Sequence, residues 1–328
     1  MTGPKYNKAD IKEIVSDLAI EAVEARELLD ATPRSEMSGV DTTTSEVDGI
    51  KVSRVNIKTP AAEKAMNKAM GSYVNIEAPG LREKDSVLQE RVSEVTAREL
   101  SQLAGFNDEM DLLVVGLGNW NVTPDSIGPK VVEDLVITRH LLEMVPDKLG
   151  IGFRSMAAMA PGVMGITGME TGEIIKGVIK ELNPTIILAV DALSARNLNR
   201  LNTTIQIADN GISPGSGVGN KRMGINYETM GVPVIAMGVP TVVEAETIVK
   251  DVINEITQRD CEGHLYLDSG MSGLINEVLQ PFRGGGNRLM VTPKEVDTFA
   301  DDISEILAGS INAAVHPRVS EEGTQKYL

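Results

Sequence analysis

Two runs of apolar residues along the chain each lead to an aspartate. Residues 112–117 are apolar or glycine and continue into a polar loop that reaches Asp125, whereas residues 186–190 run directly into Asp191. Continuous apolar runs of this length are typical of parallel strands buried on both faces. Because the carboxyl ends of such strands meet at one edge of an open α/β sheet, the pattern predicts that both aspartates lie near one crevice.

Other segments predict the elements around these two strands. Alternating or continuous apolar residues predict strands at 73–77 and 232–237, and Asp48 followed by Gly49 predicts a hairpin turn. Residues 32–49 are rich in Thr, Ser, Asp and Glu and are expected to be mostly loop. Helical spacing and start signals predict helices at 16–31, 60–70, 85–103, from 123–125 to about Glu143, 168–182, 242–257 and from the capping box at 292–295 to about Ala314.

The alternation of strand and helix over 111–191 defines the expected fold class. It predicts an α/β protein with a mostly parallel sheet flanked by helices, into which a β-hairpin and loop segments are inserted. No linker divides the 328 residues, so one domain is expected.

Composition and charge exclude several classes of protein. The net charge is −16 and aromatic residues make up 3% of the chain, which argues against direct binding of nucleic acid. No apolar run approaches the ~20 residues of a membrane span. Cys261 is the single cysteine, so no disulfide forms within the chain, as is usual in a reducing cytoplasm.

Familiar cofactor and metal motifs are incomplete. Residues 116–121 begin like a dinucleotide fingerprint, but Asn121 stands where the third glycine belongs. The glycine-rich segment 215–222 lacks the spacing of a phosphate-binding loop. The three histidines form no zinc-binding pair, so neither metal nor cofactor is expected. A Ser–His–Asp triad stays possible, although no Gly-x-Ser-x-Gly turn occurs.

The aspartates then have two interpretations. Each can be a structural acid, with Asp125 near a helix amino end, where the dipole contributes about 0.3–1 kcal/mol, and Asp191 as a cap. If they share one crevice, they cannot both ionise cheaply, so one keeps a proton. The ionised carboxylate could then accept a proton from water while the other polarises a peptide carbonyl. The helix position favours Asp125 as the base.

At these residues the chain resembles the germination proteases of spore-forming bacteria, and its sheet core resembles the hydrogenase-maturation endopeptidases. The segments that carry the resemblance are SDLAIEA (16–22), IEAPGLR (76–82), GLGNWNVTPDSIGP (116–129), APGVMG (160–165), VDAL (190–193), GISPGSGVGN (211–220) and VTPKE (291–295). Together they extend over nearly the whole chain.

The resemblance implies a tetrameric endopeptidase, made as a zymogen in the forespore and spore core, that degrades small acid-soluble spore proteins at germination. It implies an aspartic-type mechanism with Asp125 and Asp191 as catalytic residues, although the family has also been grouped with metallopeptidases. Its preference for cleaving after an acid predicts self-cleavage between Glu13 and Ile14. Residues 1–13 would then be a propeptide and 14–328 the peptidase domain.

An acidic substrate requires cations in an acidic enzyme. Arg154, Arg196, Lys221 and Arg222 lie in glycine-rich or post-strand segments and are candidates for binding it. Two other functions stay open at this point. One is a metal-dependent peptidase or hydrolase that uses the same aspartates, and the other is a nickel-sensing or assembly protein built on the maturation-endopeptidase core.

Overall fold

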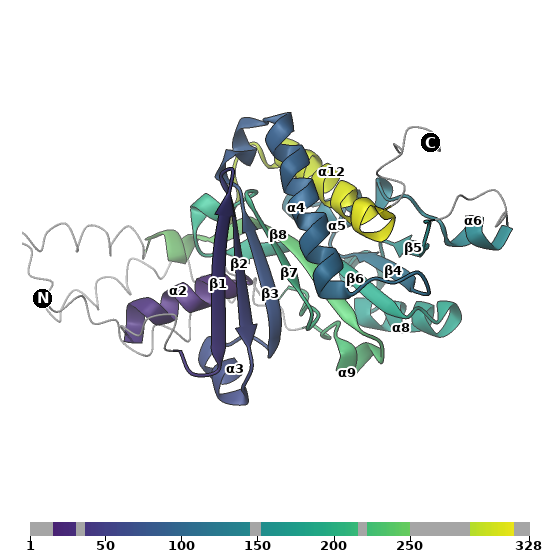
Figure 1. The fold of residues 1–328 in the computed structure, drawn as a ribbon, viewed down its shortest axis with the longest axis horizontal. Helices are drawn as coiled ribbons and strands as arrows, with labels where there is room; N and C mark the ends of the chain where they lie inside the picture. Colours follow the sequence, from purple (N-terminus) through teal and green to yellow (C-terminus); the bar gives the residue numbers. More distant parts are fainter. Residues whose placement is uncertain (1–15, 31–36, 145–151, 216–221, 250–288, 318–328) are drawn as a thin grey trace, which may run out of the picture.

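Within the residues that the computed structural model describes (16–30, 37–144, 152–215, 222–249 and 289–317), nine strands form one sheet. Its order is β1-β2-β3-β7-β8-β6-β4-β5, with β9 paired to β8 (Figure 1). The strands are β1 Val40–Val47, β2 Ile50–Ile57, β3 Gly71–Glu77, β4 Asp111–Gly116, β5 Ser155–Met159, β6 Ile186–Ala195, β7 Thr204–Ala208, β8 Val234–Glu244 and β9 Met290–Val291.

Helices flank this sheet on both faces, which confirms the expected α/β class. They are α2 Ala19–Asp30, α3 Pro60–Met66, α4 Ser86–Ala104, α5 Ile127–Glu133, α6 Arg139–Met144, α7 Met164–Thr167, α8 Thr171–Leu182, α9 Tyr227–Met230 and α12 Val296–Val315. The described residues also include the short 3-10 turns η2 Pro79–Glu83, η3 Thr123–Asp125 and η5 Leu198–Arg200. In Figure 1, α4 and α12 cross the near face of the sheet.

The sheet is mixed, and its two halves differ in direction. Strands β5, β4, β6 and β8 are parallel, whereas β7, β3, β2 and β1 continue the sheet in antiparallel pairs. The parallel half contains both apolar runs that lead to the aspartates. The antiparallel half ends in the expected hairpin, where Asp48 and Gly49 have φ of 53° and 78°, as a two-residue turn of the favoured hand requires.

The two central strands are buried on both faces, which explains their continuous apolar sequence. On β4, Leu112 and Val114 pack in the core beneath α4, α5 and α12, whereas Leu113 and Val115 pack on the other face with α8 and α9. Strand β6 alternates in the same way. A third cluster joins α2 and α3 to strands of the antiparallel half.

Several expected element boundaries are wrong, and each error has a physical cause. Residues 40–47 form a strand rather than a loop; their polar sequence reflects the sheet edge, where only Val40 is buried. Strand β8 continues through residues 242–244, which were expected to be helical, because they pair with β6 and β9.

The helices predicted after 123 and 292 also begin later than expected. Residues 123–125 form the 3-10 turn η3, and α5 then ends at Glu133 instead of reaching Glu143. Thr292 does not cap α12; its hydroxyl donates to the carbonyl of Thr241 at 2.8 Å, and the helix starts at Val296.

A buried histidine at the end of α12 makes stability depend on pH. His316 is 2% exposed; its Nδ1 accepts from the backbone N–H of Arg154 at 3.2 Å, so Nε2 carries the proton and faces the carbonyl of Val136 at 3.3 Å. Burial, together with the positive charge of Arg154, lowers the pKa of His316 to about 4. The folded state therefore keeps the ring neutral at pH values where the unfolded chain already binds a proton.

Below the ordinary histidine pKa of about 6.5, the unfolded chain binds a proton that the folded chain does not. We expect the free energy of unfolding to fall as pH decreases from about 6.5 towards 4, by at most about 3 kcal/mol from this residue. Urea unfolding at several pH values should show a flatter dependence in His316→Gln. His140, which is exposed, provides the control His140→Gln. Equal pH dependence in His316→Gln and wild type would contradict this role.

Candidate active site

The loop after β4 folds back so that Asp125 lies beside the end of β6. The backbone N–H of Leu117 donates to the carbonyl of Val190 at 2.8 Å, and that of Asn119 donates to the carbonyl of Asp125 at 2.8 Å. Gly118 has φ of 110°, and a Cβ there would lie 2.0 Å from the Asp125 carbonyl oxygen. Glycine is therefore required for the loop to close in this way.

A second glycine, Gly128, allows the start of α5 to lie against the strand ends. A Cβ on Gly128 would lie 2.2 Å from the carbonyl oxygen of Leu117 and 2.6 Å from that of Val190. From the next strand, the hydroxyl of Thr241 donates to the carbonyl of Pro124 at 2.6 Å. Contacts from β4, β6 and β8 thus fix the backbone next to Asp125.

Asp191 lies within β6, opposite Gly238 of β8. Its Oδ1 accepts from the backbone N–H of Ala192 at 2.9 Å, and the residue is 6% exposed. A Cβ on Gly238 would lie 2.6 Å from the Asp191 carbonyl oxygen, so a larger residue there would push the two strands apart.

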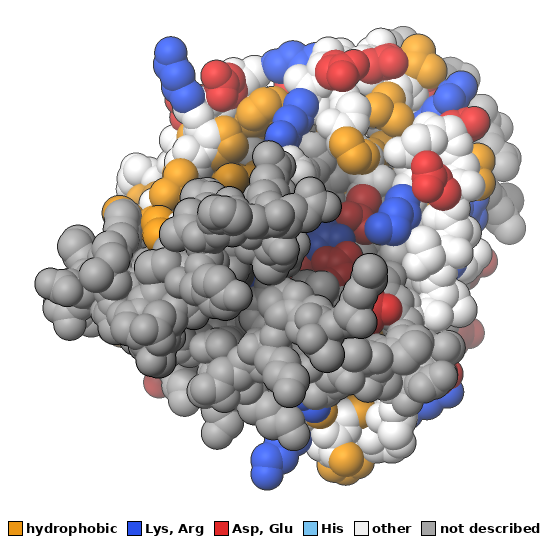
Figure 2. All heavy atoms as spheres, turned by 90° about the vertical axis from the view of Figure 1, so that its left-hand side faces the viewer, with side chains coloured by type: hydrophobic (Ala, Val, Ile, Leu, Met, Phe, Trp, Pro, Cys, Tyr) orange, Lys and Arg blue, Asp and Glu red, His pale blue; other side chains and the backbone are white. Residues whose placement is uncertain are grey.

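Both aspartates line one cavity of about 670 Å³ at the carboxyl end of the parallel strands. Among the residues that the structure describes, the charged ones in its lining are Asp17, Lys68, Asp125, Asp191 and Arg222. Figure 2 shows a hollow, on the side of the molecule that lies to the left in Figure 1, with acidic and basic side chains at its base. The sequence prediction that the two strand ends bring Asp125 and Asp191 to one crevice agrees with this arrangement.

The surroundings raise the pKa of both carboxyl groups. Burial raises the pKa of Asp125 to about 6, against the opposing effects of the Arg222 charge and a backbone hydrogen bond from Asn119. Burial also raises the pKa of Asp191 well above its ordinary value, and the charges of Asp125 and Asp17 raise it further. The two aspartates are therefore electrostatically coupled, and they titrate as a pair.

A position at a helix amino end predicts that Asp125 has the lower pKa of the two aspartates, but the pKa of Asp125 is itself raised. Asp125 is the last residue of the turn η3, before α5 begins at Ile127, and burial outweighs any helix-dipole effect. The two environments differ, because Asp125 is only partly buried, whereas Asp191 is enclosed and its pKa is raised by two acidic neighbours as well as by burial. Environment, rather than helix position, distinguishes the two carboxyl groups.

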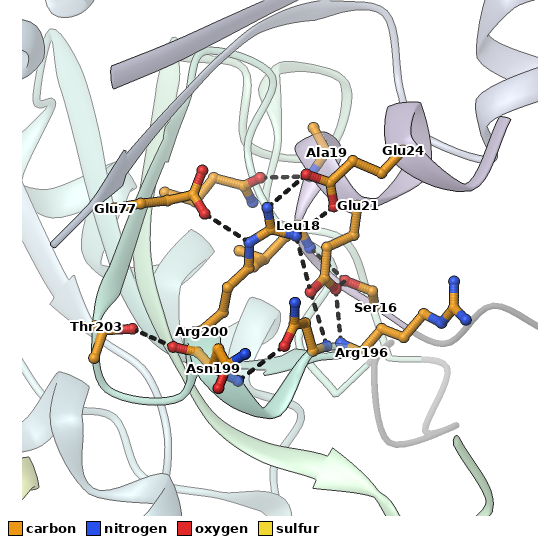
Figure 3. A network of polar contacts seen from close by, with 12 residues as sticks. Ser16, Leu18, Ala19, Glu21, Glu24, Glu77, Arg196, Asn199, Arg200 and Thr203 are labelled. Carbon is orange, nitrogen blue, oxygen red and sulfur yellow. Dashed lines mark hydrogen bonds and ion pairs between the residues drawn. The ribbon is translucent and has the colours of Figure 1, made fainter. Parts of the chain in front are cut away.

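Of the four candidate cations, the structure places Arg222 in the cavity. Arg154 lies at the opposite edge of the sheet, before β5, where its guanidinium donates to the carbonyls of Ala314 and Val315 at 3.3 and 3.0 Å. Arg196 follows β6, but it does not line the cavity, and its side chain extends away from Arg200 (Figure 3). Lys221 lies outside the described residues.

Two charged residues of the cavity, Asp17 and Lys68, were not among the predicted site residues. Both come from segments distant in sequence from Asp125 and Asp191, and neither lies at a strand end. Asp17 does fall within the segment 16–22 that carries the family resemblance, which was the one available signal. Glu13 and Ile14 lie outside the described residues.

The described residues contain no cluster of three or more His, Cys, Asp or Glu side chains arranged to hold a metal ion. None of the helices in this part of the chain combines the length and hydropathy needed to span a membrane.

Comparisons with known proteins place this chain in a family. The model of the germination protease family matches residues 19–262 and 263–328. A germination protease of Clostridium tetani is 46% identical over 318 residues, covering 94% of this chain and 98% of its relative. That of Bacillus subtilis is 43% identical over 369 residues, covering 98% and 99%.

Among solved structures, a NiFe hydrogenase maturation protease, HycI from Thermococcus kodakarensis, covers 65% of this chain and 97% of its own, with 16% identity and a TM-score of 0.31. The family assignment depends on the sequence matches alone. Since these extend over nearly all of the chain at more than 40% identity, the chain belongs to the germination protease family and is a protease.

Proposed function

We propose that this protease is an aspartic-type endopeptidase in which Asp125 and Asp191 share one proton. The observation that carries the proposal is the position of two coupled carboxyl groups with raised pKa values in one cavity. Perturbed carboxyl pairs in clefts are typical of acid–base catalysis, because the two groups must hold different protonation states at the same pH.

In the proposed reaction, ionised Asp125 accepts a proton from a water molecule, whose oxygen attacks the carbonyl carbon of the scissile peptide bond. The protonated Asp191 donates its proton to the carbonyl oxygen, which gives a neutral tetrahedral diol. Return of a proton from Asp125 to the amide nitrogen, and of a hydroxyl proton to Asp191, releases the amine and the carboxylic acid. The pair ends in its starting state, so no cofactor is consumed.

The proposed substrates are small acid-soluble spore proteins, cleaved after Glu or Asp and before a hydrophobic residue. Arg222 supports this specificity, because it is the arginine in the described cavity lining and can pair with a substrate carboxylate. We further propose that the protein is a zymogen with residues 1–13 as propeptide and 14–328 as one peptidase domain. We also propose that the protein forms a homotetramer in the forespore and spore core.

Self-processing provides a direct test. The segment 10–17 contains acids at Asp10 and Glu13 and an apolar residue at Ile14, which matches the proposed specificity. We expect purified full-length protein, under conditions that permit processing, to yield a chain starting at Ile14, as measured by intact-mass spectrometry. Glu13→Gln should slow that cleavage, whereas protein expressed as 14–328, which lacks Glu13, should hydrolyse an added peptide without prior processing. A new amino terminus elsewhere would refute the site.

A chelator distinguishes the aspartic mechanism from the metal-dependent alternative. We expect peptide hydrolysis to be unchanged after dialysis against EDTA, while variants of either aspartate are inactive. Loss of activity in EDTA that is restored by one divalent metal would instead favour the metal-dependent mechanism, in which the aspartates act as ligands.

A further inference from the structure

Large apolar side chains gather on the surface beside the active-site cavity. They come from the segments 120–122 and 164–169, which follow the neighbouring parallel strands β4 and β5 and therefore lie at the same edge of the sheet. Because soluble proteins rarely expose apolar side chains in one group, such a group marks a binding surface. The side chains, which we call the apolar rim, are between 43% and 60% exposed and belong to Trp120, Val122, Met164, Ile166 and Met169.

Two valines connect the apolar rim with the cavity. Val122 belongs to the rim and also lines the cavity, as does Val163, which is half-buried directly before α7. The backbone N–H of Asp125 donates to the carbonyl of Val122 at 2.7 Å, so Val122 is fixed next to one of the two aspartates. Figure 2 shows exposed hydrophobic side chains above the hollow. The rim therefore continues the wall of the cavity outwards.

The turn that carries Trp120 is closed by one asparagine. The side-chain Oδ1 of Asn119 accepts from the backbone N–H of Asn121 at 3.0 Å, and the carbonyl of Asn119 accepts from the N–H of Val122 at 3.1 Å. The exposed position of the Trp120 ring is therefore set by a hydrogen-bonded turn.

Helix α7 has no packing role that would explain its apolar residues. None of its four residues is buried, although Met164 and Ile166 are large and apolar. Its backbone is nevertheless closed. The carbonyl of Val163 accepts from the N–H groups of Ile166 and Thr167 at 2.9 and 3.1 Å, and the N–H of Gly168 donates to the carbonyl of Met164 at 2.8 Å. A closed turn that presents apolar side chains to solvent is suited to bind an apolar ligand.

We propose that the apolar rim, together with Val163, binds the part of the substrate that follows the cleaved bond. The inference rests on the proposed function, in which the residue before that bond is acidic and the residue after it is hydrophobic. An apolar wall suits the second of these, since a carboxylate buried against it would lose its hydration. Val122 and Val163 contact the residue directly after the bond, and Trp120, Met164 and Ile166 contact apolar residues further along.

The first experiment measures selectivity. Two short peptides that differ only in the residue after the cleaved bond, Ile or Ala, are hydrolysed by the processed wild-type enzyme and by the double variant Val122→Thr, Val163→Thr. Threonine keeps the shape of valine but adds a hydroxyl group, and both positions are at least partly exposed, so the variant should fold. We expect the ratio of kcat/KM for the two peptides to fall about tenfold, because a polar wall favours the larger apolar side chain less.

Ile166→Thr is the matched control, because Ile166 is exposed on α7 but does not line the cavity. Its ratio for the two short peptides should equal that of the wild type. Its KM for a longer peptide, with apolar residues well beyond the cleaved bond, should rise several-fold. An unchanged ratio in the double variant, or an equal fall in Ile166→Thr, would overturn the inference.

The second experiment observes the surface directly, since Trp120 is the single tryptophan of the chain and its fluorescence reports on this turn alone. In Asp191→Asn, which should bind peptides without cleaving them, we expect the longer peptide to shift the Trp120 emission to shorter wavelength, because the indole ring loses contact with water. A peptide that ends before the cleaved bond should bind without that shift. An unshifted emission when calorimetry shows the longer peptide to be bound would refute the inference.

Two other outcomes are distinguishable from these. If the rim is instead an interface between copies of the chain, Ile166→Thr should change the sedimentation coefficient of the protein and leave its KM for the longer peptide unchanged, which would overturn the inference. Failure of the proposed function would appear separately, as peptide hydrolysis that survives Asp191→Asn. The ratio for the two short peptides could still be measured in that case.

Discussion

Asp191→Asn is expected to abolish peptide hydrolysis while making the folded protein more stable. The variant keeps the size of the side chain but cannot cycle a proton, so kcat should fall by about 10³-fold or more, as is usual when an acid–base group is removed. The kcat of Asp125→Asn should fall by a similar factor. The kcat of the double variant should be little lower than that of either single variant, because the two carboxyl groups act as one unit. Single-turnover hydrolysis of a peptide by pre-processed enzyme measures this loss.

The stability effect has the opposite sign for an electrostatic reason. An acid whose pKa is raised in the folded state opposes folding at pH values above its unfolded pKa, near 3.9, because the unfolded carboxyl ionises freely and the folded one does not. The pKa of Asp191 is raised by burial and by two acidic neighbours, so its removal should raise the thermal midpoint at pH 7 but not near pH 3. A midpoint lowered at both pH values would indicate a structural role for Asp191 instead.

Arg200→Met is expected to have the largest effect on stability. The Arg200 side chain is 7% exposed and pairs with Glu24 at 2.6 Å, Glu77 at 2.9 Å and Glu21 at 3.3 Å (Figure 3). Methionine fills part of the volume but leaves buried carboxylates without their cation, which typically costs about 3–5 kcal/mol. Urea unfolding at pH 7 measures the change.

An exposed ion pair provides the control for this variant. Lys58 and Asp41 are 51% and 62% exposed, so Lys58→Ala should cost about 0–1 kcal/mol. The Arg200 cluster should also respond to acid. Burial alone would raise the pKa of Glu77, but Arg200 and Lys51 outweigh it and lower that pKa. This contribution is present above the unfolded pKa of about 4.3 and is lost as pH falls through the lower folded value. A cost for Arg200→Met no greater than for Lys58→Ala would contradict the role of the cluster.

The continuous apolar runs before Asp125 and Asp191 were sufficient to predict buried parallel strands and a shared sheet edge. The hairpin at Asp48 and Gly49 was equally clear, because few residue pairs adopt positive φ readily. The edge strand at residues 40–47 was missed, since an exposed strand carries no apolar alternation that distinguishes it from a loop. The strand end at residues 242–244 was missed because its apolar residues suit a helix as well as a doubly buried strand.

Local sequence also determined where Asp125 could be placed, through the glycines at 118 and 128 that allow the loop and α5 to approach the strand ends. The pKa values of the pair were decided by tertiary structure alone. They depend on burial beneath the strand ends and on charges brought from elsewhere, of which Asp17 is 174 positions from Asp191 and Arg222 is 31. Sequence spacing does not encode such distances, because hydrophobic burial and strand pairing bring these segments together only in the folded chain. The sequence by itself therefore determines the two aspartates and the glycine turns that hold them. The tertiary structure decides the burial and the neighbouring charges that shift the pKa of each carboxyl group.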